Sequence, residues 1–275
     1  MHGSSRISRI IFCTTIVLFA CPVWVAAGPQ AQTPPDAICQ ALFQEYIVRS
    51  GKISTSDELA AAELIASRGR TTGFWKPVLE GLRTVKGWDE IRYVRILGLM
   101  LAADAHARDN IKSGQASKMQ MISIVALPKE VVPELISRAE TAISAESGSY
   151  VGDAYTLALA QARDPRTKEF LQRMVKSENH GGNWQSVKFH AALGLAELGE
   201  PVGMEWLIAH SDDDSDGIVW GRPQYASRQQ LSLAVVAALQ VLSGQPALST
   251  KTEFQAWWKT AAATFAPKSH VSLVD

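Results

Sequence analysis

The feature that most constrains the fold of this chain is an internal repeat in its second half. Residues 151–172 read VGDAYTLALAQARDPRTKEFLQ, and residues 187–208 read VKFHAALGLAELGEPVGMEWLI, at an offset of 36 residues without a gap. The aligned positions include Leu159 with Leu195, Ala160 with Ala196, Pro165 with Pro201, Phe170 with Trp206 and Leu171 with Leu207. A period of this length is typical of stacked supersecondary units. The sequence therefore predicts tandem units that share one core.

Each of the two segments predicts a helix, a tight turn and a second helix. The turn carries an acidic residue followed by proline, as Asp164-Pro165 and Glu200-Pro201. Proline at the first position of a helix loses no hydrogen bond and presets φ. Small residues on the first helices, Ala158, Ala192 and Gly194, predict that the paired helices of each unit approach closely.

Helical spacing of apolar residues continues along the rest of the chain from Asp36. Gly69 is predicted to follow the end of one helix, and Asp89 is predicted to cap the start of another. No alternating run makes a convincing strand; Met119–Leu127 comes nearest, and a short buried helix suits it equally. The fold class that we expect is all-α.

The segment 187–208 closely resembles the short HEAT repeat, including the variety found in phycobilin-lyase-like proteins. The resemblance is carried by Val187-Lys188, Ala191-Ala192, Leu198-Gly199-Glu200-Pro201 and Leu207-Ile208, with Lys188 for Arg and Glu200 for Asp as conservative departures. Residues 151–172 fit less well, because Gly152 replaces the basic residue and Arg163 stands where glycine is usual. A third unit over 224–265 carries Leu242-Ser243-Gly244-Gln245 and Trp257-Trp258. Residues 55–146 show only degenerate traces, Ile91-Arg92 and Leu97-Gly98.

This resemblance implies a right-handed α-solenoid of stacked antiparallel helix pairs, with degenerate units in the N-terminal half. It also implies an extended concave surface that binds a protein or peptide. The resulting organisation is a signal peptide at 1–27, a linker at 28–35, an N-terminal helical region at 36–146, HEAT-like repeats at 147–265 and a tail at 266–275.

The first 27 residues have the three parts of an export signal. These are a basic start with Arg6 and Arg9, the apolar run Ile10–Ala20, and the small-residue cleavage site Val25-Ala26-Ala27. We expect cleavage before Gly28 and a periplasmic or secreted protein. Two alternatives stay open. Ile10–Ala27 is just long enough to anchor the chain in a membrane, and Leu18-Phe19-Ala20-Cys21 resembles a lipoprotein box in which Cys21 would be lipidated.

Charge and cysteine content exclude several classes of partner and site. The chain has 27 basic and 27 acidic residues, so it lacks the basic face that nucleic acids usually require. Cys39 is the one cysteine after the signal, so no intramolecular disulfide or cysteine metal cluster is expected. In an apolar helix Cys39 is predicted to be a small core residue.

The acidic run Asp212-Asp213-Asp214-Ser215-Asp216-Gly217 matches the opening of a calcium loop. Its twelfth position is Pro223 where a bidentate Glu is needed, so we expect a solvated acidic insertion and no metal. We predict that this insertion, Ser211–Tyr225, binds the partner. The residues proposed for the contact are Asp212, Asp214, Asp216, Trp220 and Arg222, together with Trp184 from another connecting loop.

No catalytic or cofactor motif was found. The histidines lack the paired spacing of metal ligands, and His190 is predicted to be a satisfied core residue. We therefore expect a binding scaffold without a cofactor. Two alternatives are an enzyme on a HEAT-like fold, of the lyase kind, and a structural component of an envelope assembly.

Overall fold

The computed structural model describes residues 35–49, 55–112, 129–145, 150–179, 184–214, 216–217 and 229–271. The chain divides into two units, Met1–Thr33 and Pro34–Asp275, and all described residues belong to the second. The predicted signal, most of the linker and the segment Met119–Leu127 lie outside the described residues.

The described part of the chain is helical, which confirms the all-α prediction. Its α-helices are α1 (Pro35–Arg49), α2 (Thr55–Thr72), α3 (Trp75–Leu82), α4 (Trp88–Lys112), α6 (Val131–Ala145), α7 (Tyr150–Gln161), α8 (Lys168–Lys176), α9 (Trp184–Glu197), α10 (Pro201–Ala209), α11 (Leu231–Ser243) and α12 (Lys251–Ala261). Two 3-10 turns, η1 (Pro165–Thr167) and η3 (Ala262–Thr264), extend them. The only strand pairing there joins β1 (Asp216–Gly217) to β2 (Gln229–Gln230), antiparallel.

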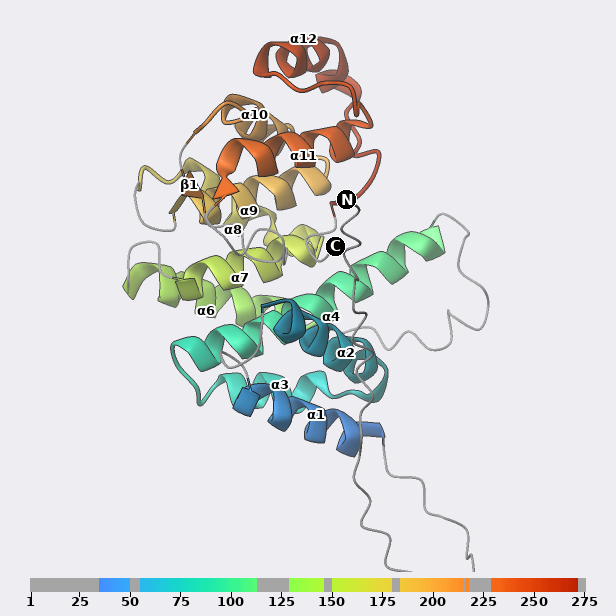
Figure 1. Cartoon of the computed structure of the whole chain (residues 1–275), viewed down its shortest axis with the longest axis vertical. Helices are drawn as coiled ribbons and strands as arrows, with labels where there is room; N and C mark the ends of the chain where they lie inside the picture. Colours follow the sequence, from blue (N-terminus) through green and yellow to red (C-terminus); the bar gives the residue numbers. More distant parts are fainter. Residues whose placement is uncertain are drawn as a thin grey trace, which may run out of the picture. The chain divides into compact units, whose positions relative to one another are not determined.

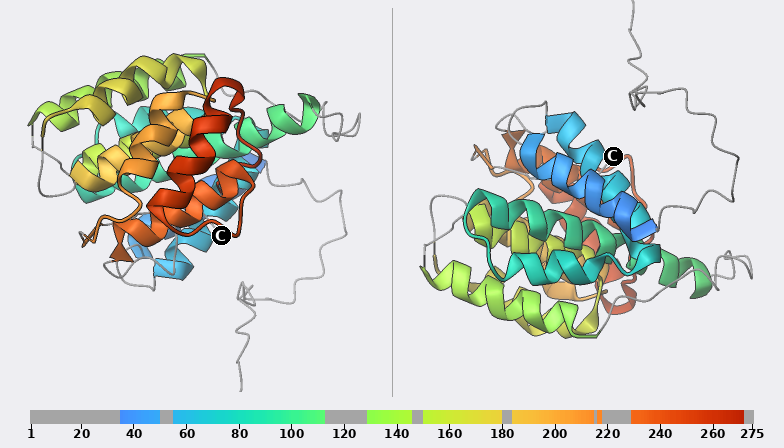
Figure 2. Two further views of the ribbon diagram at one scale, coloured as in Figure 1. Left: turned by 90° about the horizontal axis from the view of Figure 1, so that it is seen from above. Right: turned by 90° about the horizontal axis from the view of Figure 1, so that it is seen from below.

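The helices pack in a regular order within this unit. α2, α4, α7 and α9 form a row in which each helix packs on the next, and α11 follows against α9 and α10. The remaining helices lie against this row: α1 on α2, α3 on α4, α6 on α7, and both α8 and α10 on α9 (Figure 1 and Figure 2). α12 contacts α10. Most packing is therefore between elements that are near neighbours in the sequence.

Both aligned segments form a helix, a turn with proline and a second helix, and the first also has the 3-10 turn η1 before its second helix. In the first, Asp164 caps η1 by accepting a hydrogen bond from the Arg166 backbone, and Pro165 takes the first position. In the second, Pro201 begins α10 directly after Glu200. Arg163 and Gly199, which align at the 36-residue offset, both have positive φ, 43° and 80°. Arg163 therefore adopts the backbone conformation that its aligned glycine adopts, at the steric cost of a side chain there.

Small residues bring helices close together within the pair α9 and α10 at Ala192, as predicted, but Ala158 and Gly194 do so between helices of the row. A Cβ added to Gly194 would lie 2.8 Å from both Cα and Cβ of Ala160, across the α7–α9 interface. A Cβ on Gly98 would lie 2.8 Å from the Cβ of Ala158, across the α4–α7 interface. Larger side chains at either glycine would force these helices apart.

Two predicted helix boundaries are wrong. Gly69 does not follow α2 but lies inside it, where a Cβ would be 2.6 Å from Cε of Met100; the helix ends at Thr72, before Gly73 with φ of 77°. Asp89 does not cap α4 from outside but lies in its first turn, where it accepts a hydrogen bond from Arg92 at 2.5 Å. In both cases tertiary packing or a local ion pair decides the role of a residue that usually marks a helix end.

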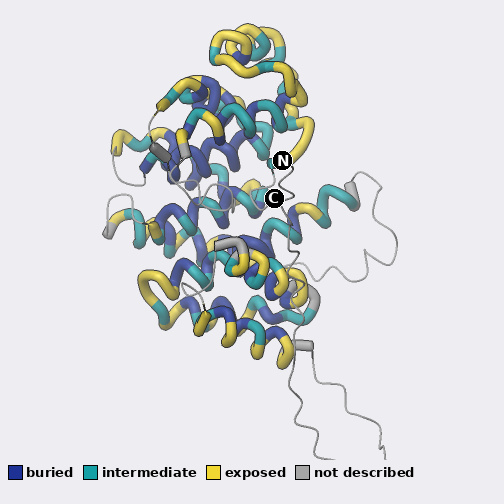
Figure 3. The backbone as a smooth tube through the Cα atoms, viewed as in Figure 1, coloured by how far each residue is buried: buried dark blue, intermediate teal, exposed yellow. Residues whose placement is uncertain are grey.

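The core follows the row of helices, and the burial in Figure 3 is greatest where α4, α7 and α9 pack together. Leu159 and Leu195, the aligned leucines, are both fully buried. Cys39 is a buried core residue, as predicted, and its sulfur lies 3.9 Å from Oγ1 of Thr72. None of the described helices has both the length and the apolar character needed to cross a membrane.

Candidate functional site

The predicted partner-binding segment leaves the end of α10 and returns to the start of α11, and its two ends are held together at the base. The Asp213 amide donates to the His210 carbonyl at 3.2 Å, and the Ser232 amide donates to the Asp213 carbonyl at 3.2 Å. Next to these bonds, Asp216 pairs with Gln230 and Gly217 with Gln229. These contacts therefore fix both ends of the segment at the α10–α11 junction.

Asp212, at this base, forms an ion pair with α12. The Asp212 side chain is 61% exposed, and its Oδ1 lies 2.8 Å from Nζ of Lys251, the first residue of α12. The hydrogen bond from Lys251 lowers the pKa of Asp212. Asp214 is exposed, and Asp216 pairs through its backbone in β1. Among the residues that the structure describes, no three His, Cys, Asp or Glu side chains are placed to hold a metal ion.

Trp184 is not the surface anchor that the sequence suggested. It is the first residue of α9 and not part of a connecting loop, and it is only 2% exposed. An aromatic side chain at a helix start buries a large apolar area when it turns inward, and Trp184 does so as part of the core. Trp220 and Arg222 lie outside the described residues.

A stacked aromatic pair precedes the acidic segment on α10. The rings of Trp206 and His210 are 3.9 Å apart with an interplanar angle of 15°. Nδ1 of His210 lies 2.8 Å from the Trp206 carbonyl oxygen. Trp206 is buried and His210, the C-cap residue, is partly exposed, so the pair covers the C-terminal end of α10 where the acidic segment begins.

A buried polar cluster joins α7 to α9. The Asp153 carboxylate accepts a hydrogen bond from the Ser186 hydroxyl at 3.0 Å, and its other oxygen lies 2.8 Å from Nδ1 of His190. All three side chains are buried, which confirms that His190 lies in the core. It is not fully satisfied as predicted, because its Nε2 has no hydrogen-bond partner among the described residues. In a serine-histidine-aspartate triad the hydroxyl bonds to the imidazole. Here the carboxylate lies between the two, so the cluster is arranged to hold helices together and not to activate Ser186.

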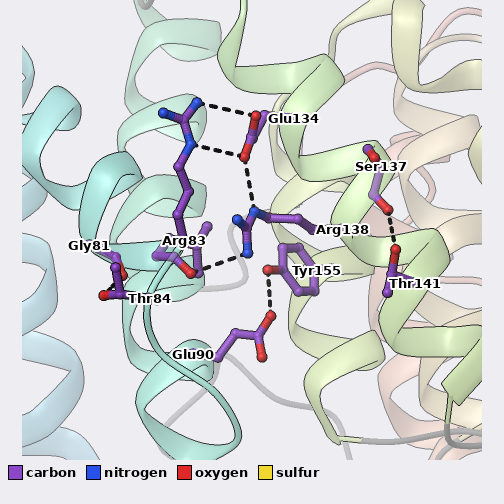
Figure 4. Close-up of polar contacts among 10 residues, drawn as sticks. Gly81, Arg83, Thr84, Glu90, Glu134, Ser137, Arg138, Thr141 and Tyr155 are labelled. Atoms are coloured by element: carbon purple, nitrogen blue, oxygen red, sulfur yellow. Dashed lines mark hydrogen bonds and ion pairs between the residues drawn. The ribbon is translucent and has the colours of Figure 1, made fainter.

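A second polar network ties α3, α4, α6 and α7 together (Figure 4). The Tyr155 hydroxyl donates to Oε1 of Glu90 at 2.8 Å, and burial raises the pKa of Tyr155. Arg138 donates to Glu134 at 3.0 Å and to the Leu82 carbonyl at 3.2 Å. Arg83 donates to both oxygens of Glu134 at 3.3 Å, and these bonds lower the pKa of Glu134.

Sequence reasoning missed both networks. Apart from Glu134 and Arg138, which lie four positions apart on α6, their partners are separated by between 33 and 65 residues, as in Ser186 with Asp153 and Tyr155 with Glu90. No spacing rule within one helix links residues so far apart. The presence of Asp153 on an otherwise apolar helix face was the one available signal, since a buried carboxylate requires partners.

Comparison with models of known protein families, with curated proteins and with solved structures gives no match. A proposal for the function must therefore rest on the arrangement of this chain's own residues.

Proposed function

We propose that this protein is an exported α-solenoid of the HEAT type that binds a protein or peptide partner in the cell envelope. The observation that carries the proposal is the repeat at 36 residues, whose two copies share a helix, a left-handed turn residue, a proline and a second helix. The packing of α2, α4, α7 and α9 in a row supports the same reading. Solenoids of this kind contact partners through extended surfaces.

Within this proposal, the segment Ser211–Tyr225 is the binding element. It is the longest insertion between helix pairs of the repeat region, and insertions in solenoids map to one face and often supply contacts. Because both ends of the segment are already held at the α10–α11 junction, less conformational entropy is lost when the segment binds a partner. Its carboxylates favour a basic partner, because complementary charge speeds association and fixes orientation.

Replacing Asp212–Tyr225 by a short Gly/Ser linker is expected to abolish capture of the partner from an envelope extract. The replacement removes the acidic residues together with Trp220 and Arg222. Circular dichroism should show an unchanged helical signal, because the replaced segment lies between α10 and α11. Capture that is undiminished in this variant would exclude the segment as a binding element.

A charge variant separates electrostatics from loss of the segment. Asp212→Asn with Asp214→Asn and Asp216→Asn should weaken capture, and the affinity of the unmodified protein should fall as salt rises. The matched control removes the same charge from exposed positions elsewhere, Glu80→Gln with Glu169→Gln and Glu205→Gln. Equal weakening by both triple variants would mean that net charge, and not the segment, governs binding.

The mature protein is expected to begin near Gly28 and to be found outside the cytoplasm. The expectation rests on the basic start, apolar run and small-residue site of residues 1–27. N-terminal sequencing of the protein from fractionated cells measures it directly. An intact Met1 in a soluble cytosolic fraction would contradict export.

A further inference from the structure

The last described residues run back from α12 toward the middle of the helix row. Phe265 packs edge-on against Trp257 and Trp258, at 6.4 and 5.2 Å between ring centroids. The Lys268 amide then donates to the Leu242 carbonyl at 2.9 Å, at the end of α11. The Val271 amide donates to Oε1 of Glu197 at 2.8 Å, at the end of α9. In Figure 1 this is the red trace that leads from α12 to the label C.

The end of this segment meets a cluster of charged groups from three other elements. Asp109 of α4 lies 2.9 Å from Nη1 of Arg163, which precedes η1, and Nε of Arg163 lies 3.9 Å from Oε2 of Glu197. His270 places Nε2 at 3.3 Å from Asp109 and Nδ1 at 3.9 Å from Glu197. The Glu197 side chain is 7% exposed, so its carboxyl group is buried at the point where the segment attaches.

We propose that Phe265–Val271 is a C-terminal strap whose attachment to α9 is controlled by the protonation of Glu197 and His270, so that it is tightest at mildly acidic pH and loosens as pH rises through neutrality. Among the described residues, Val271 of the strap is the one that donates a hydrogen bond to the Glu197 carboxyl group. Its release would open Glu197 to water and would break the link that the strap makes between α12 and the end of α9.

The direction of the dependence on pH follows from burial. The pKa of Glu197 is raised to about 7, chiefly by burial and to a smaller extent by Asp109, against the opposing effects of the Val271 amide and Arg163. An opened strap would return this pKa toward its ordinary value of 4.5. The attached state therefore binds more protons, and attachment present below the ordinary pKa is lost as pH rises through about 7.

His270 acts in the opposite direction at lower pH. Burial lowers the pKa of His270, with Arg163 and His106 of α4 adding to the effect and Asp109 opposing it. The attached state therefore disfavours the protonated imidazole, and attachment weakens as pH falls below the ordinary pKa of 6.5. Arg108 and Asp104, two further charged groups of α4, pair with each other at 3.4 Å.

Hydrogen exchange of the Val271 amide, expressed as protection relative to the intrinsic rate at each pH, tests the strap in the full chain. Between pH 6 and 8 the titration of Glu197 alone would lower the protection about 10-fold, as carboxyl pKa values of 4.5 and about 7 require. His270 acts in the opposite direction over part of this range, so the fall in the unmodified chain should be smaller than 10-fold. The Phe254 amide, bonded within α12 to Thr250, should not change and serves as the internal reference.

Two variants assign the effect to individual residues. Glu197→Gln keeps an acceptor for the Val271 amide but cannot ionise, so its protection should not fall from pH 6 to 8, and the remaining effect of His270 should raise it. His270→Gln should show the full fall of about 10-fold over this range, larger than in the unmodified chain. A fall that persists in Glu197→Gln would overturn the proposal.

A measurement on the unmodified side chain guards against a variant that fails to fold. The Glu197 carboxyl carbon, followed by nuclear magnetic resonance in the full chain, should titrate near pH 7. In a chain that ends at Ala266 it should titrate closer to 4.5, because the strap no longer covers it. A titration at the ordinary pKa in the full chain, or an identical titration in both chains, would contradict the strap.

Discussion

Replacement of Leu195 by aspartate is expected to unfold at least the C-terminal half of the described helices. Leu195 is 0% exposed and lies in α9, which packs on α7, α8, α10 and α11. An unpaired carboxylate at such a position costs several kcal/mol, comparable to the ~5–15 kcal/mol that stabilises a whole domain. Because α9 packs on α7, α8, α10 and α11, its unfolding should also destabilise these helices.

Thermal unfolding followed by circular dichroism measures this loss. The matched control is Leu233→Asp, which makes the same chemical change on α11 at a position that is 55% exposed. The control should unfold at a temperature close to that of the original protein, since a solvated carboxylate pays no desolvation cost. Equal stability of Leu195→Asp and the original protein would show that position 195 does not face the core.

Gly203→Ala is expected to destabilise the protein although alanine is the better helix former. Gly203 lies in the first turn of α10, and a Cβ there would be 2.4 Å from both the Ala192 carbonyl oxygen and the Ala196 amide nitrogen of α9. These are backbone atoms, so α9 and α10 would have to move apart. Overpacking of this kind typically costs about 1–3 kcal/mol, and more where the backbone must shift.

The sign of the change makes this test decisive. Helix propensity alone predicts a gain of up to about 1 kcal/mol for Gly→Ala, whereas contact with α9 predicts a loss. Urea denaturation gives the free energy of unfolding, and Glu205→Ala, at an exposed position of the same helix, is the control for changing α10. A gain in stability for Gly203→Ala would mean that α10 is not packed closely on α9.

The helical class and the order of elements in the second half could be predicted because their signals are local. Proline after an acidic residue marks the starts of η1 and α10, and apolar spacing marks the buried faces. The prediction failed where a local signal competed with packing. Gly69 usually ends a helix, but its lack of a side chain is needed inside α2 for contact with Met100.

The candidate site was less predictable than the fold. The acidic run could be located, but the bond from Lys251 to Asp212 joins residues 39 positions apart, and no local pattern indicates it. Trp184 follows two glycines, which suggested a loop, but α9 begins at Trp184 itself and its ring is buried. The strap was missed for the same reason, since Glu197 and Val271 are 74 positions apart.

The buried cluster of Asp153, Ser186 and His190 limits how a chain of this kind can grow in evolution. Position 189, which aligns with Asp153 at the 36-residue offset, is Phe189. A gene duplication that copied α9 and α10 in tandem would place the new histidine and serine against that phenylalanine, with no carboxylate to accept their hydrogen bonds. Because a buried polar group without a partner is costly, the α7–α9 junction is specific to one pair of neighbours, and added units would require compensating substitutions at each new junction.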